Sequence, residues 1–207
     1  MIILVRHGEA DHHIENLTGG WTDSDLTTNG ATQMRKMAAH LGKFLNGKRV
    51  MIVASDLKRT KQSAAIISKR LFMPLIYNDF LREKNNGIAA NKSNTEAQLL
   101  RLSMQENDPD SRNYPGGESR REFYNRVTEG MAKLWQDHAN QTLLIVAHKG
   151  TLQNIIFWWL GLSIDEVCRS AISFNVSAAS MSILTINRWE EHELSLLNYR
   201  VGYGKDN

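Results

Sequence analysis

Four short apolar runs, widely separated in the chain, are each followed by charged or imidazole side chains, and this pattern limits the fold more than any other feature. Residues 2–5 lead into a motif that contains His7, and residues 143–147 lead directly into His148. Short apolar runs predict buried strands, and open α/β sheets bind ligands beyond the carboxyl ends of their strands. The pattern therefore predicts that distant segments meet at one sheet edge.

Two further runs carry the same signal. Residues 50–54 precede a helical pattern that places Arg59 in its first turn, and residues 74–77 are followed shortly by Glu83. If the four strands are parallel neighbours, the side chains that follow them converge on one crevice.

Strands and helices alternate through most of the sequence, which favours a three-layer α/β/α sandwich around a mostly parallel sheet. At 207 residues the chain is long enough for one substantial core, and we expect a single domain over residues 1–207. Thr27 or Thr28 caps a helix with apolar residues at helical spacing. The other predicted elements are strands at 2–5, 50–54, 75–77, 143–147, 172–176, 180–186 and 194–198, and helices at 57–71, 94–107 and about 118–139.

The first motif suggests phosphoryl transfer. His7 can attack phosphorus as a neutral imidazole, Arg6 can hold non-bridging oxygens, and Gly8 allows an anion to approach the backbone. Taken alone, the motif could equally be a strand end with a structural histidine, and only the other strand-end residues favour a site.

The ordered set of motifs resembles the histidine phosphatase superfamily, in the phosphoglycerate mutase-like branch. That branch contains cofactor-dependent phosphoglycerate mutases, fructose-2,6-bisphosphatases and α-ribazole phosphatases, and the resemblance covers nearly the whole chain. The motifs that carry it are Arg6-His7-Gly8-Glu9, Gly20-Trp21-Thr22-Asp23, Ser55 to Arg59, Leu81-Arg82-Glu83, Pro115-Gly116-Gly117-Glu118-Ser119 and Ala147-His148.

The resemblance implies that His7 is the phosphorylated nucleophile and that Arg6, Arg59 and His148 complete a phosphate pocket. It implies that Glu83 donates and accepts the proton. Independently, two guanidinium groups and a protonated histidine can stabilise charge on phosphoryl oxygens without a metal. We expect a backbone carbonyl to fix the tautomer of His7, and His148 to be cationic beside bound phosphate.

A structural interpretation of Glu83 remains open, because a glutamate in a turn often lies exposed and pairs with a neighbouring cation. Arg82 and Lys84 flank it and are the candidate partners. An alcohol leaving group needs a proton, however, and Glu83 is the best-placed donor.

Four residues are secondary candidates for binding substrate or phosphate. His13 stands where many relatives have asparagine, and Lys149 stands where they typically have glycine; Lys149 either adds charge to the anion site or points to solvent. Thr18 and Gly19 either touch phosphate or are ordinary turn residues. We expect the adjacent His12 to be solvated.

Metal binding by His7, His12 and His13 is the alternative to an anion site. Arg6 would repel a cation, and a zinc-type spacing is absent, so we expect no metal and no cofactor.

Two cap segments, within residues 10–25 and 84–114, bear on the reaction. The second is short and lacks the paired arginines that cover substrate in mutases, so it leaves the pocket open to water. This favours hydrolysis of a small phosphorylated metabolite over mutase chemistry. A non-catalytic phosphate-binding protein is a further alternative, against which the intact set of site residues argues.

Composition limits the partners. The net charge of +3 can steer an anionic metabolite but does not indicate nucleic acid. The single cysteine, Cys168, excludes an intramolecular disulfide and suits a reducing compartment. No export signal or membrane span is visible, so we expect a cytoplasmic protein. Trp158 and Trp159 cannot share one narrow helical stripe, and core packing competes there with a homodimer contact.

Overall fold

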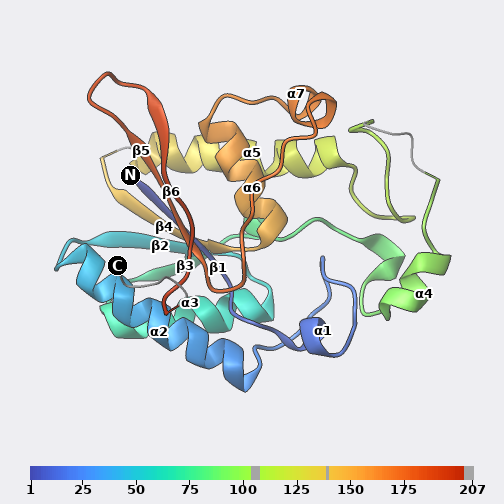
Figure 1. Cartoon of the computed structure of the whole chain (residues 1–207), viewed down its shortest axis with the longest axis horizontal. Helices are drawn as coiled ribbons and strands as arrows, with labels where there is room; N and C mark the ends of the chain where they lie inside the picture. The colour runs from blue at the N-terminus through green and yellow to red at the C-terminus, as the bar shows by residue number, and fades with distance from the viewer. Residues whose placement is uncertain (104–107, 139, 203–207) are drawn as a thin grey trace.

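A six-stranded sheet with helices on both faces forms the centre of the computed structural model, which describes residues 1–103, 108–138 and 140–202 (Figure 1). The strand order is β3-β2-β4-β1-β5-β6. The first four of these strands in spatial order pair in parallel, and the last two pair antiparallel. The strands are β1 (Ile2–Arg6), β2 (Val50–Ala54), β3 (Leu75–Tyr77), β4 (Thr142–Ala147), β5 (Met181–Ile186) and β6 (His192–Tyr199). The predicted three-layer arrangement and mostly parallel sheet are confirmed.

Helices of very different length cover the sheet and the loops at its edge. In Figure 1, α2 and α3 lie on one face, α5 and α6 lie on the other, and α1 and α4 stand apart at one end. Their bounds are α1 (Asp11–Ile14), α2 (Thr28–Leu45), α3 (Lys58–Leu71), α4 (Asn94–Leu99), α5 (Arg120–His138), α6 (Lys149–Trp159) and α7 (Ile164–Arg169), with 3₁₀ turns at Asp79–Leu81 and Gly87–Ala89.

Alternation along each buried strand divides the core into two layers. On β1, Ile3 and Val5 pack in the cluster that includes α2 and α3 residues, whereas Ile2 and Leu4 pack in the cluster that includes α5 and α6 residues. Successive side chains of a strand point to opposite faces, so a central strand that is apolar throughout requires both helical layers. Packing from both sides therefore fixes the level at which β1 ends, just before His7.

Two of the predicted elements need correction, and one element was not predicted. Residues 172–176 are not a strand: their carbonyls accept side-chain hydrogen bonds instead, from Gln153 to Phe174 and from Arg6 to Val176. The helix predicted over 94–107 is only Asn94–Leu99, and positions 104–107 lie outside the described residues, as does residue 139 at the end of the helix predicted over 118–139. The polar segment after β1 contains the unpredicted short helix α1.

The tryptophan pair divides as the helical geometry requires. Trp159 is 1% exposed and belongs to the core, whereas Trp158 is half-buried.

No helix among the described residues is long and apolar enough to cross a membrane.

The start of α2 is packed tightly against the segment that follows β1. Thr27 caps the helix by accepting a hydrogen bond from the backbone N–H of Gly30 (2.9 Å), and its hydroxyl donates to the carboxylate of Glu9 (2.6 Å). A Cβ added to Gly30 would lie 1.9 Å from the backbone oxygen of Glu9. Only glycine allows this approach, which holds the loop after His7 against α2.

This packing predicts opposite effects for two glycines of the same helix. We expect Gly30→Ala to lower the free energy of unfolding by about 1–3 kcal/mol, because rigid backbone must move. A Cβ at Gly42 would meet its nearest side-chain atom at 3.7 Å, so Gly42→Ala should raise that free energy by about 0.5–1 kcal/mol. Urea denaturation of both variants and the wild type measures the difference, and equal effects would contradict the close contact.

Candidate functional site

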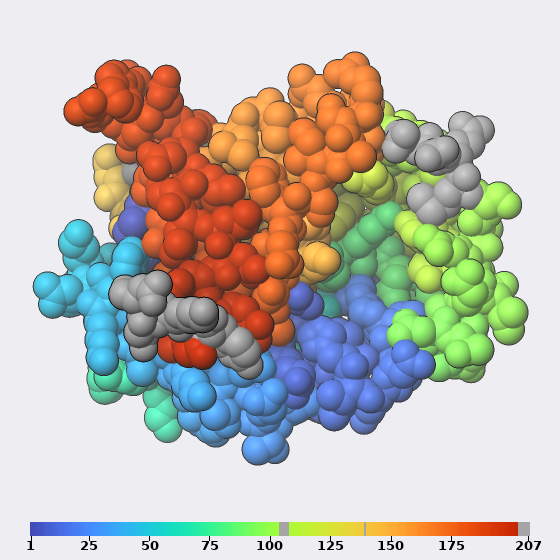
Figure 2. Space-filling model, in the orientation of Figure 1, coloured from blue at the N-terminus to red at the C-terminus, as the bar shows by residue number. Residues whose placement is uncertain are grey.

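The site lies beyond the carboxyl ends of the parallel strands. His7 follows β1 and its backbone N–H donates to Ala147 at the end of β4 (3.1 Å), while the ring centroids of His7 and His148 are 5.2 Å apart. Figure 2 shows this face hollowed between the blue N-terminal segment, the green segment and the orange α6–α7 region. Residues separated by more than 140 positions thus meet in one place.

His7 is held as a neutral imidazole with one free nitrogen. Its Nδ1 donates to the backbone carbonyl of Gly8 (2.7 Å), as the sequence predicts, so Nε2 keeps its lone pair. The ring is buried, and burial lowers its pKa well below the usual value, with further lowering by Arg59, His148 and Arg6. A neutral ring is what a nucleophile toward phosphorus needs.

The two arginines approach from different elements. Arg59, in the first turn of α3, is 1% exposed and donates to the backbone carbonyls of Thr22 and Gly20 (2.7 Å each). Arg6 donates to Val176 (2.9 Å). Burial is the main cause that lowers the pKa of Arg59, to about 10, and both remain cationic at neutral pH. Within the part of the chain that is described, the Nε of each guanidinium has no hydrogen-bond partner.

His148 is held by a residue that the sequence analysis missed. Its Nε2 lies 2.9 Å from the hydroxyl of Ser55, which itself accepts from the N–H of Leu57 (3.3 Å). The Ser55 hydroxyl can therefore donate to Nε2, which leaves the proton on Nδ1, an atom without a partner among the described residues. Burial, Arg59 and Arg6 lower the pKa of His148, so the expected cationic form requires an anion beside the ring.

His12 is not solvated as predicted. Its side chain is buried, with 7% exposed. The Nδ1 atom is within hydrogen-bond distance of the Ser24 hydroxyl (2.7 Å), and the ring lies against that of His13, with the centroids 4.0 Å apart. Burial is the first cause that lowers the pKa of His12 to about 3 and that of His13 to about 4. The rings of His7 and His13 are stacked, 5.7 Å apart, and Nε2 of His13 lies 3.3 Å from Arg6.

Glu83 is fixed by backbone donors rather than by flanking cations. Its two carboxylate oxygens accept from the N–H groups of Lys84 and Gly150 (2.9 Å each), and Arg82 instead pairs with Asp56. A Cβ at Gly150 would lie 2.5 Å from a Glu83 oxygen, so glycine permits this approach. The exposed-turn alternative for Glu83 is therefore not what the structure shows.

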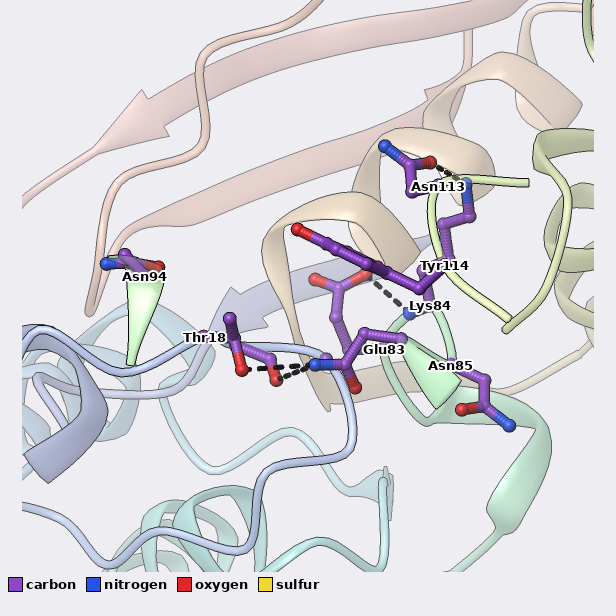
Figure 3. Close-up of a pocket in the computed structure, with 10 residues that line it drawn as sticks. Thr18, Glu83, Lys84, Asn85, Asn94, Asn113 and Tyr114 are labelled. Carbon is purple, nitrogen blue, oxygen red and sulfur yellow. Dashed lines mark hydrogen bonds between the residues drawn. The ribbon is translucent and has the colours of Figure 1, made fainter. Parts of the chain in front are cut away.

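A cavity of about 310 Å³, which we call the Thr18 cavity, opens beside Glu83 (Figure 3). Thr18 and Gly19 line it, together with amide side chains that include Asn86. Asn86 donates to the Thr18 hydroxyl (3.2 Å) and to the Gly19 carbonyl (3.1 Å) and thereby ties the two cap segments together. Trp21 adds a second tie, since its indole N–H donates to the carbonyl of Glu83 (2.8 Å).

Lys149 is a candidate that the structure does not place in either cavity beside Glu83. It is exposed at the first position of α6.

No group of three His, Cys, Asp or Glu side chains within residues 1–103, 108–138 and 140–202 is arranged to hold a metal ion.

The residues that the sequence analysis missed are those that hold the candidates in place. Ser55 is the first residue of the motif that ends at Arg59, and Asn86 lies three residues after Glu83. Polar residues of these types occur in most loops, so neither one is conspicuous in the sequence. Their position directly after β2 and shortly after Glu83 was the only available signal.

Comparison with known proteins identifies the family. A sequence profile of the histidine phosphatase superfamily (branch 1) matches residues 2–199. The chain belongs to this superfamily. Its members of known sequence include the uncharacterized phosphatase PhoE of Bacillus subtilis, which is 30% identical over 155 residues, 75% of each chain.

Two other members of the superfamily show the breadth of the similarity. The 2,3-bisphosphoglycerate-dependent phosphoglycerate mutase of Bartonella bacilliformis is 32% identical over 184 residues, which are 84% of this chain and 88% of the mutase. The solved structure of the α-ribazole phosphatase from Shigella flexneri gives a TM-score of 0.82 at 24% identity and covers 96% of both chains, which demonstrates the shared fold.

The buried imidazole of His12 makes stability depend on pH. Below about pH 6.5 the unfolded chain binds a proton at this residue that the folded protein excludes until about pH 3, so the free energy of unfolding falls as the pH falls through that window. We expect His12→Asn to reduce this slope by up to about 1.4 kcal/mol per pH unit. Urea denaturation at pH 7, 6 and 5 measures the change of the free energy of unfolding with pH in the wild type and in the variant. Equal slopes in the two proteins would refute this role of His12.

Proposed function

We propose that this protein is a metal-independent phosphatase that hydrolyses a small phosphorylated metabolite through a phosphohistidine on His7. The observation that carries the proposal is the state of that ring: it is neutral, its Nδ1 is engaged by Gly8, its Nε2 is free, and Arg59, His148 and Arg6 act on it electrostatically. The phosphatase names of several relatives support the same reaction class.

The reaction has two displacement steps. In the first, Nε2 of His7 forms a bond to phosphorus, the bond from phosphorus to the substrate oxygen breaks, and Glu83 gives that oxygen a proton. In the second, water attacks the phosphohistidine while the now anionic Glu83 takes a proton from it, which releases inorganic phosphate and restores both residues. No other reactant is needed.

The surrounding cations supply the electrostatic stabilisation. A guanidinium has five N–H donors, and the protein uses two of those of Arg59, so donors remain for the equatorial oxygens of the transferred group. Nδ1 of His148 adds a donor, and a phosphate dianion beside it would raise the pKa of the ring and favour the cation that the sequence analysis expects.

The secondary candidates have unequal support. His13 accepts from the N–H of Ala10 through Nδ1 (3.1 Å), so its neutral ring carries the proton on Nε2, beside Arg6. Two N–H donors whose nitrogens lie 3.3 Å apart are proposed to share one phosphate oxygen. Thr18 and Gly19 are proposed as contacts on the leaving-group side, and Lys149 is proposed only as a surface charge.

The domain and cell-level proposals follow the sequence. Residues 1–207 are proposed as one domain, with cap segments within 10–25 and 84–114. The protein is proposed to act in the cytoplasm and not to bind nucleic acid. A homodimer contact near Trp158 is a further proposal. The half-buried Trp158 is compatible with either packing.

His7→Ala should abolish phosphatase activity. With p-nitrophenyl phosphate in the presence of EDTA, we expect the wild type to release phosphate and form an acid-labile phosphoenzyme, and the variant to do neither, because no other group accepts the phosphoryl group. His40→Ala, in α2 beside Tyr199, is the control and should retain activity. Loss of wild-type activity on chelation, or a phosphoenzyme in the variant, would contradict the mechanism.

Mutase chemistry is the second candidate, because several relatives carry that name. A mutase must keep water from its phosphohistidine, whereas the Thr18 cavity opens beside Glu83. We therefore expect 3-phosphoglycerate with a 2,3-bisphosphoglycerate primer to yield inorganic phosphate faster than 2-phosphoglycerate. Phosphorus NMR follows both products, and predominant isomerisation would favour the mutase.

A further inference from the structure

A second cavity, of about 260 Å³, lies next to the same carboxylate that borders the Thr18 cavity. Glu83 and Lys84 line both cavities. The second one is bounded by α5 and α6, and we call it the Arg120 cavity after the cation at the start of α5. Because Glu83 is the proposed proton donor to the leaving group, a cavity that it lines is positioned to receive that group.

Two cations that line the Arg120 cavity form no ion pair with a described residue, although Glu118 and Glu83 act on Lys84 through space. Within the described chain, the guanidinium of the half-buried Arg120 makes no hydrogen bond or ion pair, and the ammonium of the half-buried Lys84 donates only to the side-chain oxygen of Asn113 (2.8 Å). Burial and the nearby charge of Arg120 lower the pKa of Lys84. Like charges at this proximity disfavour each other, and an anion between them would relieve the repulsion.

The nearby carboxylates are already engaged. Glu118 binds the guanidinium of Arg126 through both oxygens (2.7 and 2.8 Å), and Glu83 accepts from two backbone N–H groups. The charge of Arg120 therefore has no paired acid among the residues that the structure describes.

A buried amide in the same cavity also lacks a partner. Asn154, on α6, is 6% exposed and lines the cavity, yet its Nδ2 makes no hydrogen bond to any described residue. An unsatisfied buried donor is unfavourable by about 1–3 kcal/mol, and an acceptor from a ligand would satisfy it. The adjacent Gln153 donates through its amide nitrogen to Ser173 and Phe174, and among the described residues its amide oxygen accepts nothing from Asn154.

The remaining wall is apolar. Phe123 and Phe157 face the cavity with Ile164 and Ile172. Such a wall suits a hydrocarbon or ring, and the cations suit an acidic group attached to it. The Thr18 cavity is different, since neutral amides and Tyr114 dominate its lining and Lys84 is its one cation among the described lining residues.

We propose that the Arg120 cavity is a leaving-group subsite that selects phosphomonoesters with an apolar body and a carboxylate, held by Arg120, Lys84 and Asn154. The proposal rests on the phosphatase function above and specifies its substrate class. Arg120 acts on binding of the ester and takes no part in the transfer of the phosphoryl group.

Two aryl phosphates of nearly equal shape test the charge preference. 4-Carboxyphenyl phosphate carries the carboxylate, and 4-carbamoylphenyl phosphate replaces it with a neutral amide. We expect the wild type to favour the first by at least about tenfold in kcat/KM, mainly through KM. Arg120→Gln should reduce that ratio at least about threefold, with a remainder from Lys84 and Asn154. Arg120→Lys should keep part of the preference.

Arg169→Gln is the matched control, because it removes the same charge as Arg120→Gln at a different place. Arg169 is exposed on α7 and lines neither cavity. It should keep the wild-type ratio. Thermal denaturation of each variant establishes that it is folded.

The outcomes separate the two proposals. If both esters are hydrolysed but the ratio is near one in the wild type, or is equal in the Arg120→Gln and Arg169→Gln variants, the subsite is wrong and the phosphatase function stands. If neither ester nor p-nitrophenyl phosphate is hydrolysed, the phosphatase function fails. Calorimetric binding of the two esters to wild type and Arg120→Gln then decides the subsite alone, and equal affinities would overturn it.

Discussion

Burial of positive charge at the sheet edge is the constraint on which the site depends. Arg59 is almost fully enclosed. It donates to two backbone carbonyls and pairs with no carboxylate among the described residues, while Glu83 and Asp23 act on it only through space. An enclosed charge without a paired anion is unfavourable. The same enclosure keeps His7 neutral, and it makes a phosphoryl group the natural complement of the pocket. Nucleophile and anion site therefore share one physical origin.

The strand-end residues could be predicted because strand burial and strand direction together fix where they lie. An apolar run of four or five residues that must pack on both faces identifies β1 and β4, and parallel pairing then brings His7 and His148 together. The segment at 172–176 has a similar apolar pattern, but its carbonyls accept from the side chains of Gln153 and Arg6, and sequence periodicity does not distinguish such a segment from a strand.

The residues that hold the site in place could not be predicted to the same extent. His12 looked like a loop residue, yet α1 turns it inward onto Ser24. Ser55 and Asn86 act through contacts with segments far away in the sequence, to His148 and to Thr18 and Gly19. Such contacts depend on how the loops meet, which local spacing does not encode. The two cavities on either side of Glu83 likewise arise from distant elements and leave little trace in any single motif.

The carbonyls of Gly20 and Thr22 that hold Arg59 give the first cap segment a role larger than covering the pocket. The same segment is tied to the Glu83 region through Trp21 and Asn86, so the anion-binding arginine and the proton donor rest on one shared support. A lineage that altered this loop to admit a new metabolite would disturb both chemical functions at once. Substitutions on the apolar wall beside Arg120 would leave the hydrogen bonds of Arg59 and Trp21 in place, so a change of metabolite is easier to accommodate there.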